Sequence, residues 1–192
     1  MTTRTRLSVL LTAASVIGAS AVVGLAGASA ATAAPARSDA SVAPLTAPLR
    51  APAYYEVLAR HSRKCLDVRG ASTADSAPVI QYTCHLGHNQ EWRLVHISGN
   101  YYELIARHSG KCLDVRGASR ADSAPVIQYT CHRGANQQWR PVAMPGGYYE
   151  LVARHSGKCL DVRGASRANS APVIQYTCHR GANQQWGFIA VR

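Results

Sequence analysis

A block of sequence occurs three times in this chain at a fixed period of 47 residues, and no insertion separates the copies. Each copy reads Cys-Leu-Asp-Val-Arg-Gly-Ala-Ser, then Ala-Pro-Val-Ile-Gln-Tyr-Thr-Cys-His, then Asn-Gln-x-Trp. Self-similarity at this period predicts one supersecondary unit that closes against its siblings, because about 47 residues are too few for an independent core. Polar residues are triplicated along with the apolar ones, which favours three equivalent surfaces over one asymmetric catalytic centre.

Each copy contains four short β-prone runs with turn residues between them. In the first copy they span residues 54–59, 64–68, 79–83 and 92–95. No helical periodicity of useful length follows the N-terminal segment, so twelve strands in about 140 residues form one all-β domain. Closing three units around a pseudo-threefold axis predicts a β-trefoil, since three blades are too few for a propeller. Leu66, Leu113 and Leu160 are predicted as equivalent core members.

The first 33 residues have the organisation of a secretory signal peptide. Arg4 and Arg6 precede an uncharged, Ala-rich apolar run, and Ala31-Thr32-Ala33 supplies an A-x-A cleavage site. A membrane anchor is the alternative, because the run approaches spanning length; the cleavage site favours a secreted protein with no membrane span after removal of the signal. Residues 34–52 are rich in Ala, Pro and Ser, which is typical of a disordered spacer. The folded domain is therefore expected over residues 53–192.

The charge balance is strongly basic. The chain has 21 Lys and Arg residues against 10 Asp and Glu, and removing residues 1–33 leaves 19 against 10, a net charge of +9. Export argues against DNA or RNA as a partner, and no Lys/Arg run with interleaved aromatics is present. Two interpretations stay open: a well-solvated surface, or attraction to an acidic polymer such as one on a cell surface.

Six cysteines fall into three pairs whose members lie 19 positions apart. In an exported chain this indicates a disulfide framework. Six cysteines allow 15 connectivities, and the repeat symmetry favours pairing within each copy, each bridge being worth roughly 3 kcal/mol in the chain-entropy model. A metal site using the His after each second cysteine lacks a C-x-x-C and a fourth ligand, so no metal or other cofactor is predicted. The predicted pairs are Cys65 with Cys84, Cys112 with Cys131, and Cys159 with Cys178.

In each copy an acidic residue and an aromatic residue are predicted to lie near the disulfide, on the same face of the two strands that it joins. Side chains two apart in a strand share a face; Asp67 is two after Cys65, and Tyr82 is two before Cys84. An ionised Asp accepts hydrogen bonds from two neighbouring hydroxyls, and a Tyr ring offers an apolar face to a pyranose. An Asn before the last strand adds an amide that donates and accepts. The candidate sugar sites are Asp67, Tyr82 and Asn89; Asp114, Tyr129 and Asn136; and Asp161, Tyr176 and Asn183.

Each residue type also has a structural interpretation. The Asp residues can cap a turn or pair with the Arg two positions later, and the Tyr residues can be half-buried packing. The Trp residues are predicted to lie in the core. The Gln residues two positions before them are predicted to be structural or to support the Asp. The His residues of the Arg-His-Ser turns are predicted to be surface loop residues. The residues concerned are Arg69, Arg116 and Arg163; Trp92, Trp139 and Trp186; Gln90, Gln137 and Gln184; and His61, His108 and His155.

Each copy closely resembles the ricin-type lectin repeat, which is also found in bacterial xylan-binding modules. The resemblance rests on three features: Cys-Leu-Asp-Val, an aromatic residue two positions before the second cysteine, and Asn-Gln-x-Trp. The resemblance covers residues 54–192, with the Q-x-W signature in register in all three copies. It implies a β-trefoil whose sugar pockets use the Asp after Cys-Leu, the stacking aromatic and the Asn before the signature, while the signature Gln orients the Asp. On this chain the orienting role would fall on Gln90, Gln137 and Gln184.

The chain departs from the family pattern at one sugar-facing position. Many relatives have a Gln two before the aromatic, facing the sugar, so that contact is in question here. The first copy also differs from the others nearby, with Arg63 for Gly, His88 for Ala and Glu91 for Gln, and its affinity is expected to differ. At the departing position this chain has Ile80, Ile127 and Ile174, and it places Gln81, Gln128 and Gln175 next to the Tyr.

The sequence therefore predicts a secreted, monomeric, non-catalytic lectin with three sites for a glycan or polysaccharide of galactose or xylose type. A glycoside hydrolase needs two carboxylates about 5 to 10 Å apart, and each copy has one well-placed Asp. Only the Glu after Tyr-Tyr also recurs, as Glu56, Glu103 and Glu150, and its position is predicted to be solvent-facing and structural. The alternative is a β-trefoil that binds a protein, as an inhibitor or toxin-associated subunit, because the fold alone does not fix function.

Overall fold

The computed structural model describes residues 54–191; the predicted signal peptide and spacer lie outside these residues. No helix within them is long and apolar enough to cross a membrane. The four strands predicted for each copy are confirmed, and the fourth is longer than expected because it forms a hairpin with the next copy. The strands are β1 (Tyr54–Ala59), β2 (Cys65–Val68), β3 (Val79–Tyr82), β4 (Glu91–Ser98), β5 (Tyr101–Ala106), β6 (Cys112–Val115), β7 (Val126–Tyr129), β8 (Trp139–Met144), β9 (Tyr148–Ala153), β10 (Cys159–Val162), β11 (Ala171–Tyr176) and β12 (Gln185–Val191).

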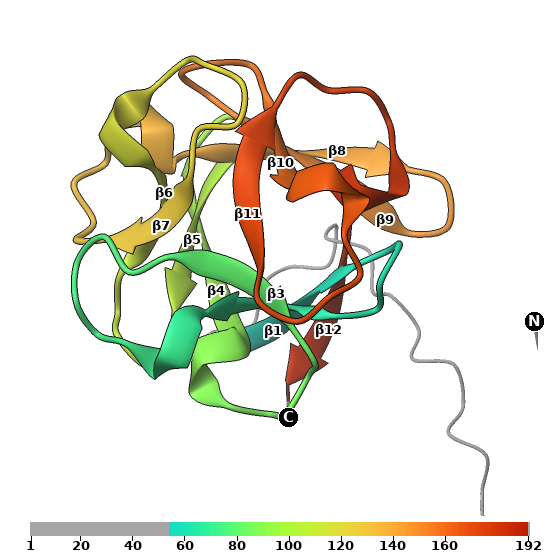
Figure 1. Cartoon of the computed structure of the whole chain (residues 1–192). Helices are drawn as coiled ribbons and strands as arrows, with labels where there is room; N and C mark the ends of the chain where they lie inside the picture. The colour runs from blue at the N-terminus through green and yellow to red at the C-terminus, as the bar shows by residue number, and fades with distance from the viewer. Residues whose placement is uncertain (1–53, 192) are drawn as a thin grey trace, which may run out of the picture. The chain divides into compact units, whose positions relative to one another are not determined.

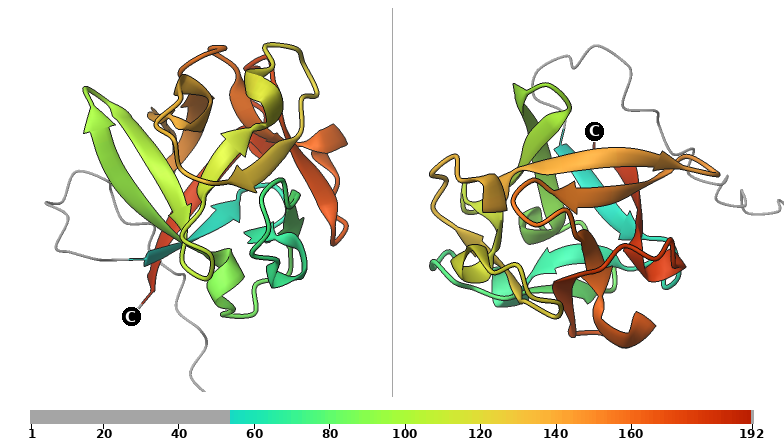
Figure 2. Two further views of the ribbon diagram at one scale, coloured as in Figure 1. Left: turned by 90° about the vertical axis from the view of Figure 1, so that its left-hand side faces the viewer. Right: turned by 90° about the horizontal axis from the view of Figure 1, so that it is seen from above.

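Six of these strands close into a barrel. β1 pairs with β12 and β4, β5 pairs with β4 and β8, and β9 pairs with β8 and β12, so the ring of antiparallel pairs has no free edge. The other strands form one hairpin per copy: β2–β3, β6–β7 and β10–β11. These three cap hairpins lie around a common axis (Figure 1), while the β4–β5 hairpin, green in Figure 2, extends from the barrel. The predicted β-trefoil with pseudo-threefold symmetry is confirmed.

The cap hairpins contact one another in a closed triangle. Isolated bridges join Pro78 to Ile127 and Pro125 to Ile174, and β11 pairs with β3. The Gln next to each site Tyr ties neighbouring copies together: Gln81 is fully buried, and its Nε2 donates to the carbonyls of Ser166 at 2.6 Å and Ala168 at 2.9 Å. Gln128 and Gln175 make the equivalent bonds. The Gln placed beside the Tyr is therefore a link between copies.

The core lies inside the barrel and beneath the cap hairpins, as predicted. Leu66, Leu113 and Leu160 are fully buried, and so are the three signature Trp residues. Each indole Nε1 donates to the carbonyl of the Leu in its own copy, at 3.0 to 3.1 Å, which satisfies the polar atom of a large buried ring. The signature Trp thus holds the cap hairpin on the barrel.

The three predicted disulfides are confirmed: Cys65–Cys84, Cys112–Cys131 and Cys159–Cys178. Each fastens the start of one cap strand to the residues that follow its partner strand. A cluster of Glu56, Cys65 and Cys84 brings potential metal-ligand atoms together, but both sulfurs are already bonded to each other. The cluster therefore offers no thiolate to a metal.

One expectation about the polar residues was wrong. Glu56, Glu103 and Glu150 are buried rather than solvent-facing. The loop after the cap hairpin of the same copy lies close to them, with His85 and Leu86 near Glu56, and His132 and Arg133 near Glu103. Burial raises the pKa of Glu56 and Glu103. The histidines of the Arg-His-Ser turns do lie in turns, and they are half-buried. Each lies with Nε2 2.9 Å from the carbonyl of a Ser in a neighbouring copy, and the pairs are His61 with Ser166, His108 with Ser72 and His155 with Ser119.

Candidate functional site

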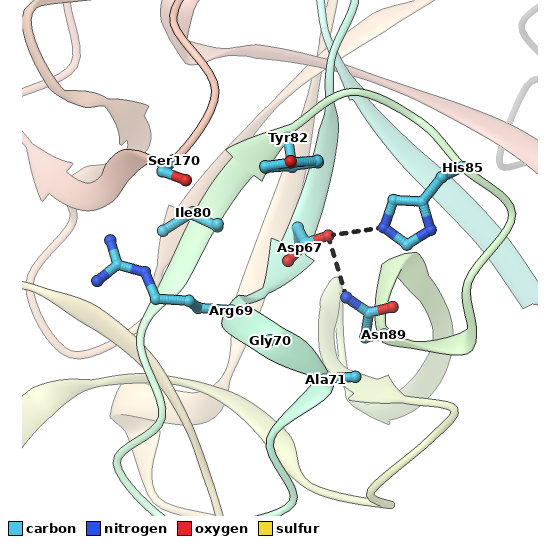
Figure 3. A pocket seen from close by; sticks show the side chains of 9 residues that line it. All are labelled: Asp67, Arg69, Gly70, Ala71, Ile80, Tyr82, His85, Asn89 and Ser170. Carbon is cyan, nitrogen blue, oxygen red and sulfur yellow. Dashed lines mark hydrogen bonds and ion pairs between the residues drawn. The ribbon is translucent and has the colours of Figure 1, made fainter.

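Three equivalent hollows open beside the cap hairpins, with volumes of about 350, 340 and 380 Å³ in the first, second and third copies. Each is built from the end of the first cap strand, the facing strand, the 3-10 helix after each of them, and one Ser from the neighbouring copy. Figure 3 shows the hollow of the first copy. Its lining is Asp67, Arg69, Gly70, Ala71, Ile80, Tyr82, His85, Asn89 and Ser170. The predicted Asp, Tyr and Asn of each copy therefore meet in one place.

The aspartate of each hollow is held by its own copy. Asp67 Oδ2 accepts bonds from Asn89 Nδ2 at 3.0 Å and Gln90 Nε2 at 2.7 Å, and His85 Nε2 lies 3.4 Å away. The second and third copies repeat this arrangement within 0.2 Å. All these contacts converge on Oδ2, and Figure 3 shows the other carboxylate oxygen turned toward the hollow.

The aspartates of the three hollows are buried. Asp67, Asp114 and Asp161 are only 3%, 2% and 3% exposed, because the loop after the cap hairpin folds back over them. Desolvation raises the pKa of each carboxyl group, against the lowering effect of the Gln, Asn and His neighbours. The expected alternative pairing of Asp67 with Arg69 does not occur; the side chain beside the carboxylate is the imidazole of His85.

The tyrosines are the accessible part of the site. Tyr82 pairs with Cys65 in the cap hairpin, so the disulfide fixes the strand end that carries the ring. The residue is 37% exposed, and its ring meets the imidazole of His85 edge-on, with ring centroids 6.1 Å apart. Tyr129 and Tyr176 have the same environment. One face of each ring is thus left available for stacking.

The histidine after each second cysteine was not predicted as a site residue. A role was weighed for it only as a metal partner of the cysteine, whereas in every copy it lines a hollow beside the Asp and the Tyr. These residues are His85, His132 and His179. A glycine two residues later makes this packing possible: a Cβ on Gly87 would overlap the imidazole of His85 and lie 2.6 Å from Asn89 Oδ1. The recurrent Cys-His-x-Gly was the available signal.

The residues two before the tyrosines also lie in the hollows. The residues are Ile80, Ile127 and Ile174. An apolar side chain therefore occupies the position at which the family pattern has a sugar-facing Gln. The signature Gln residues do not line the hollows; they are fully buried and reach the ligand-facing Asp from behind.

Comparison with known families decides what these repeats are. The ricin-type beta-trefoil lectin domain matches residues 53–186. The chain belongs to the ricin-type β-trefoil lectin family. A designed three-fold symmetric protein, ThreeFoil, is 57% identical with a TM-score of 0.71, over 72% of this chain and 99% of ThreeFoil. No match was found among curated proteins.

Two further proteins of known structure are similar to this chain. An exo-β-1,3-galactanase from Clostridium thermocellum is 34% identical with a TM-score of 0.71, and the match covers 72% of this chain and 30% of the galactanase. The Rhizoctonia solani agglutinin is 28% identical with a TM-score of 0.67, over 76% of this chain and all of the agglutinin. The lectin family and its lectin relatives support a carbohydrate-binding role for this chain.

Proposed function

We propose that this ricin-type lectin is secreted, acts without catalysis, and holds galactose- or xylose-type sugar residues of a polysaccharide in its three hollows. The observation that carries the proposal is the threefold recurrence of one arrangement: a fixed Asp with one carboxylate oxygen toward the hollow, an accessible Tyr ring, and a His and an Asn beside them. The predicted signal peptide supports secretion.

The chemistry of each hollow suits the two faces of a sugar. An ionised Asp67 accepts hydrogen bonds from adjacent hydroxyls, and a charge-assisted bond of this kind contributes about 1.5–3 kcal/mol. The ring of Tyr82 covers the C–H face. Asn89 and His85 supply further polar atoms at the Asp end of the hollow. Because the Asp is fixed before the sugar arrives, little ordering is required on binding.

Multivalency would turn weak single sites into useful retention. A single shallow site is expected to bind near millimolar, about 4 kcal/mol, and three sites on one rigid domain gain roughly 10² to 10⁴ in avidity when the target presents sugars at a matching spacing. Sites that point away from a common axis cannot share one short oligosaccharide. The expected target is therefore a branched or immobilised polymer.

The test uses the exposed tyrosines, because the buried aspartates also support the fold. A triple variant, Tyr82→Ala with Tyr129→Ala and Tyr176→Ala, should lose nearly all retention on an insoluble polysaccharide while its thermal unfolding changes little. The matched triple Tyr→Phe variant keeps the stacking face and should retain most binding. Retention by the Ala variant that free sugar does not compete would show that the domain binds its partner by another surface, as the protein-binding alternative requires.

A further inference from the structure

Each sugar hollow has a positively charged end that the Asp and Tyr do not use. Arg69 comes two residues after Asp67, where the chain leaves β2, and both side chains line the same hollow. Figure 3 shows the guanidinium of Arg69 on the opposite side of the hollow from Asp67 and His85. Ile80 lies between the two ends and Tyr82 lies beside Asp67, and together they supply an apolar surface. Arg163 and Arg116 occupy the same place in the other copies.

These arginines have no acidic partner among the described residues. The ion pairs of residues 54–191 involve other basic side chains. Arg116 and Arg163 each donate one bond to a backbone carbonyl of the neighbouring copy, from Nη2 to Ser76 and to Ser123 at 3.3 Å. That single bond steadies the guanidinium and leaves most of its five donors unused.

The two ends of the hollow come from different elements. Asp67 lies in β2, whereas Arg69 begins the 3-10 helix that follows it, and Figure 3 shows Ile80 between their side chains. A sugar whose hydroxyls meet Asp67 therefore presents its substituents, or the next residue of a polymer, to Arg69. The apolar Ile80 between them makes no hydrogen bond that would compete with the guanidinium.

We propose that the glycan bound by these hollows carries an anionic group, and that Arg69, Arg116 and Arg163 each bind one such group next to the sugar held by the Asp. The inference rests on the proposed function. A guanidinium presents donors in a fixed fork that matches the oxygens of a carboxylate or sulfate. The net charge of +9 expected after removal of the signal peptide favours the approach of an acidic polymer over long range.

The experiment compares polymers that differ only in charge. One pair is an immobilised xylan with glucuronic acid side groups and the same xylan after its carboxyl groups are reduced to CH₂OH; the second pair is a galactan and its sulfated form. Binding is measured by biolayer interferometry at about 0.15 M salt, where exposed charges more than about 8 Å apart are screened. The test variant is the triple Arg69→Gln, Arg116→Gln, Arg163→Gln.

A matched control removes the same charge elsewhere. Arg120, Arg140 and Arg167 are exposed, and none lines a hollow, so their triple Gln variant has the same net charge as the test variant. Wild type and control should bind at least one acidic polymer about tenfold or more tighter than its neutral counterpart. The test variant should bind acidic and neutral polymers alike.

The outcomes separate this inference from the proposed function. Preference for only the carboxylated or only the sulfated polymer supports the inference and identifies the anion. Equal binding of charged and neutral polymers by wild type overturns it and leaves the lectin function intact, as does equal loss of preference in the test and control variants. If the triple Tyr→Ala variant still binds the acidic polymer, the sugar sites are not involved and the proposed function itself is wrong.

Discussion

The amide nitrogen of Gln90 lies 2.7 Å from Asp67 Oδ2. The other end of the same amide accepts a bond from the backbone N–H of His85 at 2.9 Å, so one buried side chain fixes both the aspartate and the loop that covers it. The second and third copies repeat the pair of bonds. The signature Gln thus prepares the hollow from behind, without lining it.

Replacing that Gln by Glu should destabilise the domain strongly. In Gln137→Glu a carboxylate oxygen takes the place of Nε2, which lies 2.9 Å from Asp114 Oδ2 and 3.0 Å from the carbonyl of Thr130. Two buried like charges then face each other, and we expect a loss of about 3–5 kcal/mol in the free energy of unfolding. Urea denaturation followed by Trp fluorescence measures the change.

The neighbouring position supplies the matched control. Gln138→Glu introduces the residue that the first copy already has as Glu91, where Arg107 Nη1 lies 2.6 Å from Glu91 Oε2. Arg154 Nη1 is equally close to Gln138 Oε1, so the new charge meets a cation. The variant loses only the bond from Nε2 to the carbonyl of Arg133 and should cost clearly less stability than Gln137→Glu, which sets two carboxylates against each other. Equal losses in the two variants would contradict the assigned role of the signature Gln.

Sugar binding should weaken on acidification before the fold does. The pKa values of Asp67, Asp114 and Asp161 are raised by desolvation, so the carboxylates become protonated, and lose acceptor strength, above the ordinary aspartate value of about 3.9. In this window the folded state takes up more protons than the unfolded chain, so these groups make folding more favourable as pH falls. Polysaccharide affinity should therefore decline while the thermal midpoint does not fall on their account.

The control for this pH dependence replaces the histidine of each hollow. A triple His85→Gln, His132→Gln, His179→Gln variant keeps a hydrogen-bond donor beside each Asp and should still lose affinity above pH 3.9. Asp75 and Asp122, whose pKa values are lowered chiefly by hydrogen bonds from Lys111 and Lys158, stay ionised in this window. Loss of binding only in step with loss of intrinsic Trp fluorescence would refute the prediction.

Most of the fold could be predicted from the sequence because each apolar or cysteine position recurs three times in the same register. The strands, the disulfide pairing and the burial of Leu66 were predicted from this recurrence. The burial of Asp67 and Glu56 was not predicted, because a polar residue is hidden here by a loop from later in the same copy, and the sequence does not show how that loop folds back. His85 was missed for the same reason: its neighbour in sequence is a cysteine, but its neighbour in space is the aspartate.

The first copy contains a strained turn that one substitution should relieve. Arg63 has a positive φ of 60° where Gly110 and Gly157 stand in the other copies, and a non-glycine residue in this region costs roughly 1–2 kcal/mol. Arg63→Gly should stabilise the domain by up to about 1 kcal/mol, less than the strain because Gly also gains freedom in the unfolded chain. Gly110→Arg should destabilise it. Thermal unfolding of both variants checks the signs, and a stabilising Gly110→Arg would contradict the account.

The interface between the third and first copies lacks an ion pair that the other two interfaces have. Lys111 Nζ lies 2.7 Å from Asp75 Oδ1, and Lys158 Nζ lies 2.7 Å from Asp122 Oδ1. The corresponding acid position is Asn169, whose Oδ1 accepts a bond from the backbone N–H of Thr83. Lys64, which would be its partner, donates only to the hydroxyl of Thr83.

Asn169→Asp should therefore give the interface between the third and first copies the ion pair that the other two interfaces have. The new carboxylate keeps the acceptor oxygens that bond to Thr83 and adds attraction to Lys64, an exposed pair worth about 0.2–1 kcal/mol. Denaturation at about 0.05 M salt should show the gain, and most of it should vanish at about 1 M because the exposed charges are then screened. Asp122→Asn, the reverse change at an intact interface, should lose a similar amount with the same salt dependence. A gain from Asn169→Asp that is indifferent to salt would mean that the two interfaces differ by something other than this charge.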